Sequence, residues 1–112
     1  MTDTIFSKII NKEIPADIVY EDDLSIAFND ISPEAPTHIL VVPKKAIPKL
    51  SEIKEEDENL LGHLLIVAKK ITDDNNIKDF RLVINNGSGA GQTVFHLHLH
   101  ILAGRNFGWP PG

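Results

Sequence analysis

The spacing of hydrophobic and polar residues along the chain predicts two helices separated by short strands. In the segment 54–74, apolar residues recur at intervals of one, three and four, which is typical of a helix with one buried face. Acidic residues lie in its first turn, and Lys69 and Lys70 lie in its later part. Negative charge near the start and positive charge near the end of a helix both interact favourably with the helix dipole. A shorter helical pattern at 6–10, before Pro15, predicts a short N-terminal helix.

Five further segments have the composition and the boundaries of β-strands. They are rich in β-branched and other apolar residues, and turn-forming residues separate them. In the second of them, Leu24, Ile26 and Phe28 recur with a period of two and are expected on one side of the strand. The turn at 22–23 predicts that the first two strands form a hairpin. The expected strands are 17–20, 24–29, 38–42, 80–85 and 95–102.

These elements predict an α+β domain in which one long helix packs on a five-stranded antiparallel sheet. The chain has 112 residues, which is the size of one domain, so we expect a single domain over residues 1–112. One amphipathic helix covers at most one face of five strands. The other face, or an edge of the sheet, therefore needs a partner, and we expect a homodimer.

Charge and composition argue against several classes of protein. There are 16 acidic side chains against 11 basic ones, and the net charge of −5 disfavours binding to nucleic acid or to an anionic membrane surface. The absence of cysteine excludes disulfides and thiol chemistry. No apolar run approaches the roughly 20 residues that span a bilayer, and the N-terminus lacks the pattern of a signal peptide. We therefore expect a soluble, cytoplasmic protein that binds neither nucleic acid nor membrane.

Three of the five histidines alternate with aliphatic residues in the stretch HLHLHI. In a strand, alternate side chains point to opposite faces, so His96, His98 and His100 are expected on one face and the aliphatic residues on the other. The aliphatic face can pack on the core. The imidazole face carries ring nitrogens that need hydrogen-bond partners, so the pattern favours a functional role.

Two kinds of chemistry fit this row of imidazoles. Two neighbours on a strand face lie about 7 Å apart and can converge on one metal ion. A third ligand would have to be His38, His63 or a carboxylate, so the motif alone is a weak metal site. Alternatively, a neutral imidazole attacks phosphorus as a nucleophile at neutral pH, while a neighbouring cationic imidazole stabilises the phosphate oxygens.

The second interpretation also needs a site for a phosphate group. The loop 87–93 is rich in glycine and leads directly into the histidine stretch. Glycine allows a backbone that turns its N–H groups toward an anion. A glycine loop alone is weak evidence. A glycine loop before three alternating histidines favours chemistry at phosphate, for which we expect neither a metal nor another cofactor.

Motifs spread over nearly the whole chain match one known family. They are DTIFSKIINKEIPA, FNDISPEAPTH, VVPKK, LLGHL, GAGQTVFHLHLHILAGR and the terminal WPPG. With them the sequence resembles the histidine triad (HIT) superfamily, and within it the histidine triad nucleotide-binding branch. The resemblance implies the HIT-like fold, a homodimer and a purine nucleoside phosphoramidase. Such an enzyme hydrolyses the P–N bond of nucleoside 5′-phosphoramidates, through a nucleotidyl-histidine intermediate, to a nucleoside monophosphate and an amine.

The resemblance also implies roles for single residues around the histidine stretch. His98 would be the nucleophile, and the backbone around His96 would hold the His98 ring in the required tautomer. His100 would contact the α-phosphate; the nucleotidyl-transferase branch has Gln at this position, so His100 favours hydrolysis. Thr93 stands where many members have Ser. Its hydroxyl would protonate the leaving amine, and its methyl group would crowd it.

The implied nucleotide site draws on residues from most of the chain. Asp30 would accept hydrogen bonds from both ribose hydroxyls, with Ile31 beside it. The phosphate and leaving-group side would lie against Asn85, Gly91, Gln92 and Thr93, and the purine ring against Phe6, Ile9, Ile14, Phe28 and Leu40. His38 would lie near the triad without touching the substrate. Trp109, in the tail 103–112, would reach the leaving-group side partly across the dimer interface.

Other functions remain compatible with these residues. A dinucleoside polyphosphate hydrolase of the same superfamily is one, although the terminal WPPG argues against it. The others are a nucleotide-binding or scaffold protein without a catalytic task, and a metal-binding regulator. Ala46, where a His is common, weakens the metal interpretation. Phe95 and Gly108 also depart from the residues common in the family and bear on the preferred leaving group.

Overall fold

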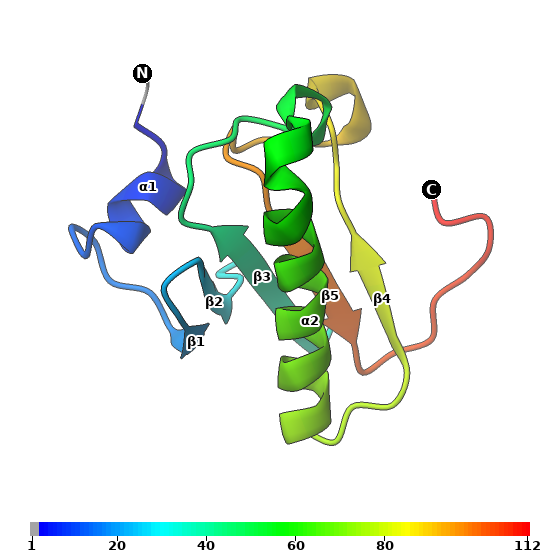
Figure 1. The fold of residues 1–112 in the computed structure, drawn as a ribbon. Helices are drawn as coiled ribbons and strands as arrows, with labels where there is room; N and C mark the ends of the chain where they lie inside the picture. Colours follow the sequence, from blue (N-terminus) through cyan, green and yellow to red (C-terminus); the bar gives the residue numbers. More distant parts are fainter. Residues whose placement is uncertain (1–2) are drawn as a thin grey trace.

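The computed structural model describes residues 3–112 as a five-stranded antiparallel sheet with a long helix across one face (Figure 1). The elements in chain order are α1 (Ile5–Ile10), β1 (Ile18–Glu21), β2 (Ser25–Asn29), β3 (Thr37–Pro43), α2 (Glu58–Asp74), β4 (Phe80–Val83) and β5 (Leu99–Ala103). The strands lie in the order β1-β2-β3-β5-β4, and each neighbouring pair is antiparallel. The predicted α+β fold is confirmed. None of the helices within residues 3–112 is long and apolar enough to cross a membrane.

Two side chains at the start of α1 cap that helix. The Thr4 Oγ1 accepts the Ser7 N–H at 3.1 Å, and the Ser7 Oγ accepts the Thr4 N–H at 2.8 Å. This reciprocal pair satisfies N–H groups that have no partner inside the helix. The helix buries Phe6 and Ile9. The short N-terminal helix predicted at 6–10 is therefore confirmed, and it presents two apolar side chains to the sheet.

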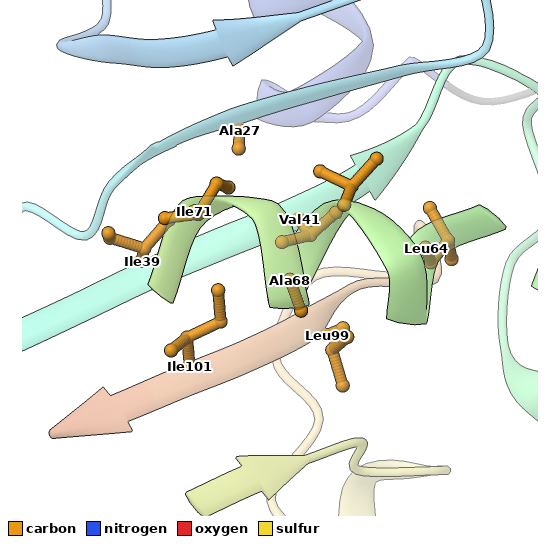
Figure 2. Packing of buried hydrophobic residues seen from close by; sticks show 9 residues of the cluster. Ala27, Ile39, Val41, Leu64, Ala68, Ile71, Leu99 and Ile101 are labelled. Atoms are coloured by element: carbon orange, nitrogen blue, oxygen red, sulfur yellow. The ribbon is translucent and has the colours of Figure 1, made fainter. Parts of the chain in front are cut away.

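Helix α2 packs on one face of the sheet through a buried apolar cluster (Figure 2). The strands supply Ala27, Ile39, Val41, Leu99 and Ile101, and the helix supplies Leu64, Val67, Ala68 and Ile71. Burial of an aliphatic side chain of this size contributes about 1.5–3 kcal/mol to stability. Leu99 and Ile101 are two of the aliphatic residues in the histidine stretch, so the prediction that they face the core is confirmed.

The alternate residues of the same strands form a second cluster on the opposite face of the sheet. This cluster consists of Ile26 and Phe28 of β2, Leu40 and Val42 of β3, and Phe6 and Ile9 of α1. Strand β3 is therefore buried on both faces, which explains its uninterrupted apolar sequence. The chain itself thus covers part of the face that a single helix leaves open, and the rest of that face lines a cavity.

The strand that carries the histidines is shorter than predicted. β5 begins at Leu99 rather than at 95, and β4 ends at Val83 rather than at 85. Before Leu99 the chain leaves the sheet because it bonds to the loop after β3, where the Leu97 N–H donates to the Ile47 carbonyl at 2.7 Å. Only the last of the three triad histidines, His100, therefore lies within a strand.

Two further differences concern the long helix and the hairpin. Helix α2 begins at Glu58 rather than at 54, after a separate 3₁₀ turn, Glu55–Asp57. Leu24 precedes β2 and is half exposed, so it does not share the buried side of the strand as predicted. Its N–H donates to the Asp22 Oδ1 at 2.9 Å and belongs to the turn. The predicted hairpin of β1 and β2 is confirmed.

Candidate active site

A cavity of about 590 Å³ lies on the sheet face opposite α2. The sequence-predicted residues that line it are Phe6, Ile9, Ile14, Phe28, Asp30, Ile31, His38, Leu40, Asn85, Gly91, Thr93, His98 and His100. Its wall also contains Ile5, Pro15, Ala16, Asn29, Ser32, Glu34 and Val94, which the sequence analysis did not select. Most of these residues lie directly next to a predicted site residue in the sequence, and this adjacency is the signal by which they could have been found. Three predicted residues, His96, Gln92 and Trp109, lie outside the cavity wall.

The ring of His98 is held in one orientation and one tautomer. Its Nδ1 lies 2.7 Å from the His96 carbonyl oxygen, which can only accept, so Nδ1 carries the proton and Nε2 has a free lone pair. The edge of the Phe6 ring packs on it, with centroids 4.9 Å apart and planes at 88°. Burial lowers the pKa of His98 below its usual value, so the ring is neutral at pH 7.

His96 contacts His98 through its backbone rather than its ring. Its imidazole is buried, and its Nε2 donates to the Pro43 carbonyl at 2.7 Å. The ring lines a separate depression on the other side of α1, with Thr4, Ser7 and Lys44. The predicted row of three imidazoles on one face is therefore reduced to two in the cavity, because the chain before Leu99 is not a strand.

His98 and His100 are the two triad rings in the cavity, with centroids 4.9 Å apart. Burial, and then the nearby His98 and His38 rings, lower the pKa of His100 to about 4. His100 is therefore neutral at pH 7 and is not a cationic neighbour of the kind that one interpretation of the sequence invoked. Any help that it gives to a phosphate oxygen comes from an N–H donor.

A chain of hydrogen bonds determines which nitrogen of His100 carries its proton. The Glu34 N–H donates to His38 Nδ1 at 3.0 Å, so the His38 proton is on Nε2. His38 Nε2 lies 2.9 Å from His100 Nδ1 and donates to it, which leaves the His100 proton on Nε2. Among the described residues this Nε2 is buried without a hydrogen-bond partner. A buried donor without a partner is costly, so this atom is available to a ligand atom that accepts a hydrogen bond.

Asp30 lies at the end of β2 beside this chain of hydrogen bonds. Its Oδ1 accepts the Ser32 N–H at 2.8 Å and its backbone N–H donates to the His38 carbonyl at 2.9 Å, so both ends of the residue are fixed. The Oδ2 lies 3.5 Å from His38 Nε2. The carboxylate lines the cavity and is only partly buried, which leaves it accessible to a ligand hydroxyl.

One group of side chains in the cavity could hold a metal ion. Asp30, His38 and His100 each offer one ligand atom, and these atoms lie within 4.8 Å of one another. Two imidazoles and a carboxylate suit a divalent transition metal. His38 Nε2 and His100 Nδ1 are already joined by a hydrogen bond, however, so a metal ion between these two nitrogens would replace the proton there.

The glycine-rich loop uses most of its own N–H groups. Ala90, Gly91 and Gln92 donate to carbonyls of Gly87 and Ser88 in the same loop. The Gln92 side chain completes the loop, because its Oε1 accepts the Gly87 N–H at 2.8 Å and its Nε2 donates to two carbonyls. Gln92 is buried there rather than exposed to the cavity.

The end of the glycine-rich loop is the part that reaches the cavity. Its last residue, Thr93, and the next residue, Val94, both line the wall. Gly91, with φ of +94°, also lines the wall and directs the chain past the Asn85 side chain. Of the loop residues predicted to bind phosphate, Gly91 and Thr93 therefore line the cavity and Gln92 does not, and the phosphate contact stays a prediction.

The C-terminal tail runs beside β4 and away from the cavity of its own chain. The Arg81 Nη2 donates to the Gly108 carbonyl at 3.0 Å and fixes the tail at this edge. Trp109 is 84% exposed, and no residue of the tail, all of which the structure describes, is in the cavity wall. The expected position of Trp109 on the leaving-group side thus depends on a second copy of the chain and stays a prediction.

Comparison with known proteins gives concordant matches. The family model of the HIT domain matches residues 11–107. An uncharacterised HIT-like protein of Synechocystis sp. is 66% identical over 111 residues, which are 98% of this chain and 97% of that protein. The crystal structure of a HIT family hydrolase from Legionella pneumophila is 46% identical, with a TM-score of 0.95 over 98% of this chain and 100% of that one. A histidine triad nucleotide-binding protein from Candida albicans is 34% identical, with a TM-score of 0.80 over 96% and 83%.

Proposed function

The chain belongs to the HIT domain family, and on that premise we propose that it hydrolyses the P–N bond of purine nucleoside 5′-phosphoramidates. The state of two ring nitrogens in the cavity carries this proposal. His98 Nε2 is unprotonated and has a lone pair available for attack, because the ring proton is on Nδ1. His100 Nε2 is a buried N–H donor without a partner. A neutral nucleophile next to a donor for an anionic oxygen suits attack on phosphorus.

The rest of the cavity wall suits a nucleotide. Phe6, Phe28 and Ile9 offer aromatic and aliphatic surface to a flat purine ring. Asp30 offers a carboxylate oxygen to the ribose hydroxyls. Hydrogen bonds from hydroxyl groups to an ionised carboxylate are stronger than those between neutral groups. The nucleotide-binding protein from Candida albicans, which shares this fold, supports the assignment.

The proposed reaction has two displacements at phosphorus. In the first, the lone pair of His98 Nε2 forms a bond to phosphorus while the P–N bond of the substrate breaks. The leaving nitrogen takes a proton from the Thr93 hydroxyl, which regains one from water, and departs as an amine. In the second, water attacks phosphorus, the bond to Nε2 breaks, and the nucleoside monophosphate is released. The His96 carbonyl, which accepts the His98 Nδ1–H, stabilises the positive charge on the ring in the intermediate.

The substitution His98→Asn tests the proposal. It removes the nucleophile while keeping a polar side chain of similar reach, so turnover of an adenosine phosphoramidate is expected to fall below detection. Affinity for AMP, measured by calorimetry, is expected to change only modestly because the apolar wall and Asp30 remain. Turnover at the wild-type rate in this variant would reject His98 as the nucleophile. Faster hydrolysis of dinucleoside polyphosphates than of phosphoramidates by the wild type would replace the proposed substrate class.

We also propose that two copies of the chain pair along the edge at β4. Among the strands within residues 3–112, β4 bonds to β5 alone, so the backbone groups on its other side have no strand partner there. Phe80 in β4 and Trp109 in the adjoining tail are exposed there, and α2 exposes Leu65 and Ile66. Burial of these apolar surfaces would stabilise a dimer. Sedimentation at micromolar concentration is expected to give the dimer mass, and a monomer alone would refute the pairing.

A further inference from the structure

The segment after β5 is joined to the loop that carries Asp30 and leads into His38. The Arg105 Nε donates to the Glu34 carbonyl oxygen at 3.0 Å, across 71 positions of the chain. Next to it Gly104 lies against Pro36, so closely that a Cβ on Gly104 would be 2.8 Å from the Pro36 Cβ. Two adjacent contacts thus hold the start of the tail on this loop.

The loop 30–36 between β2 and β3 has few restraints of its own. It contains no helix or strand, and Pro33 and Pro36 have no N–H to donate. Glu34 is exposed, yet both of its backbone polar groups are engaged. Its N–H donates to His38 Nδ1 and its carbonyl accepts from Arg105. Arg105 therefore restrains the one residue whose N–H determines the tautomer of His38.

The tautomer of His38 in turn determines what His100 presents to the cavity. While the Glu34 N–H occupies His38 Nδ1, the His38 proton stays on Nε2 and the His100 proton stays on its own Nε2. Without that N–H, the His38 proton can move to Nδ1. His38 Nε2 then accepts from His100 Nδ1, and His100 Nε2 turns a lone pair toward the phosphate oxygen, which is repulsive.

We propose that Arg105 is a positioning residue for the hydrolysis, which acts through Glu34 and His38 to keep the proton on His100 Nε2. Its effect on turnover rests on the proposed function, whereas its effect on the two ring tautomers does not. The Arg105 guanidinium stacks on the Phe107 ring, with its Cζ 4.3 Å from the ring centroid. This stacking fixes the direction in which the Nε–H points.

Arg81 provides a matched control in the same part of the molecule. Its guanidinium lies over the same Phe107 ring, at 5.1 Å, and it also donates to a backbone carbonyl. That carbonyl belongs to Gly108 in the tail and not to Glu34. A general loosening of the tail would therefore change the ring tautomers in Arg81→Gln and Arg105→Gln alike, whereas the proposed role changes these tautomers only in the second variant.

The experiment measures the ring nitrogens and the turnover of the same proteins. Long-range proton–nitrogen NMR of the free protein is expected to show the proton on Nε2 of His38 and His100 in the wild type and in Arg81→Gln. Arg105→Gln is expected to populate the other tautomers, and Arg105→Lys, which keeps a cationic donor, to restore the wild-type state in part. With an adenosine phosphoramidate, Arg105→Gln is expected to lower kcat roughly three- to tenfold, the scale of one ordinary hydrogen bond, with a smaller change in KM.

Glu34→Pro gives the same test without a change at Arg105. It removes the N–H that His38 Nδ1 accepts and also fixes φ, at an exposed position outside any helix or strand, and it is expected to reproduce the ring spectra of Arg105→Gln. Ring spectra like those of the wild type in either variant, or equal changes in Arg81→Gln, would overturn the role of Arg105. If the wild type does not hydrolyse phosphoramidates, the proposed function fails, and the ring spectra still decide the role of Arg105.

Discussion

His38 Nε2 lies 2.9 Å from His100 Nδ1, although the two residues are 62 positions apart in the chain. The antiparallel register of β3 and β5 explains this contact. Leu40 pairs directly with His100, and His38 lies two residues from Leu40 on the same face, so the two imidazoles are diagonal neighbours. The pair connects a backbone N–H of the loop after β2 to a ring N–H inside the cavity.

Loss of His38 is therefore expected to impair catalysis more than binding. His38→Asn removes the donor to His100 Nδ1, so the His100 proton is no longer held on Nε2. We expect kcat for an adenosine phosphoramidate to fall by about tenfold or more, the cost of a lost buried hydrogen bond. The control is His63→Asn, since His63 lies on α2 and bonds to Asp22 at 2.7 Å, away from the cavity. An equal loss in both variants would contradict the coupling of His38 to His100.

The buried histidines are expected to make the fold sensitive to mild acid. Burial lowers the pKa of His96 and His98, and lowers that of His100 to about 4 with help from the neighbouring imidazoles. Below about pH 6.5 these histidines bind protons in the unfolded chain but not in the native chain. Their contribution to the free energy of unfolding is therefore complete above that pH and decreases as the pH falls toward about 4. Urea unfolding followed at several pH values measures this. A midpoint that stays constant between pH 7 and about pH 5 would contradict it.

Two glycines are expected to respond in opposite directions to alanine. Gly104 has φ of +96°, and an added Cβ would lie 2.8 Å from Pro36, so Gly104→Ala is expected to destabilise the fold by about 1–3 kcal/mol. Gly62 lies inside α2 with no atom within 4 Å of an added Cβ, so Gly62→Ala is expected to stabilise by about 0.5–1 kcal/mol. Urea denaturation of both variants provides the comparison. An unchanged free energy of unfolding in Gly104→Ala would contradict the prediction, because it would show that Gly104 can move away from Pro36 at no cost.

Zinc is expected to inhibit the enzyme and a chelator to leave it active. A zinc ion held by Asp30, His38 and His100 would occupy the Asp30 carboxylate, and so block the proposed contact with the ribose hydroxyls. Turnover in the presence of EDTA, and then with added zinc, measures this directly. Activity that is lost in EDTA and recovered with zinc would instead support the metal interpretation of the histidine motif.

Much of the fold and of the cavity could be predicted because the responsible patterns are local. The period of two in β2, β3 and β5 separates core residues such as Leu99 from cavity residues such as His100. The early start predicted for β5 was wrong, because its period of two continues through residues 95–98 while the backbone there bonds to the loop at Ile47. Sequence periodicity contains no information about such a partner.

Glu34 escaped sequence reasoning because it acts through backbone atoms. Glu34 contributes an N–H and a carbonyl, and any residue except proline has both, so its side chain gave no signal. Arg105 lies in the motif that resembles the family, but its contact spans the chain. Gln92 shows the converse. An amide in a glycine-rich loop is typical of a phosphate site, yet here its polar atoms satisfy the loop itself.

The most direct test of the central claim is to identify the covalent intermediate. The wild-type protein is mixed with an adenosine phosphoramidate, quenched in alkaline denaturant within the first turnover, digested and examined by mass spectrometry. If His98 Nε2 attacks phosphorus, the peptide that contains His98 gains the mass of an adenylyl group, and the same peptide from His98→Asn does not. Rapid turnover with no adduct in the wild type, or an adduct on a different residue, would contradict the assignment of His98 as the nucleophile.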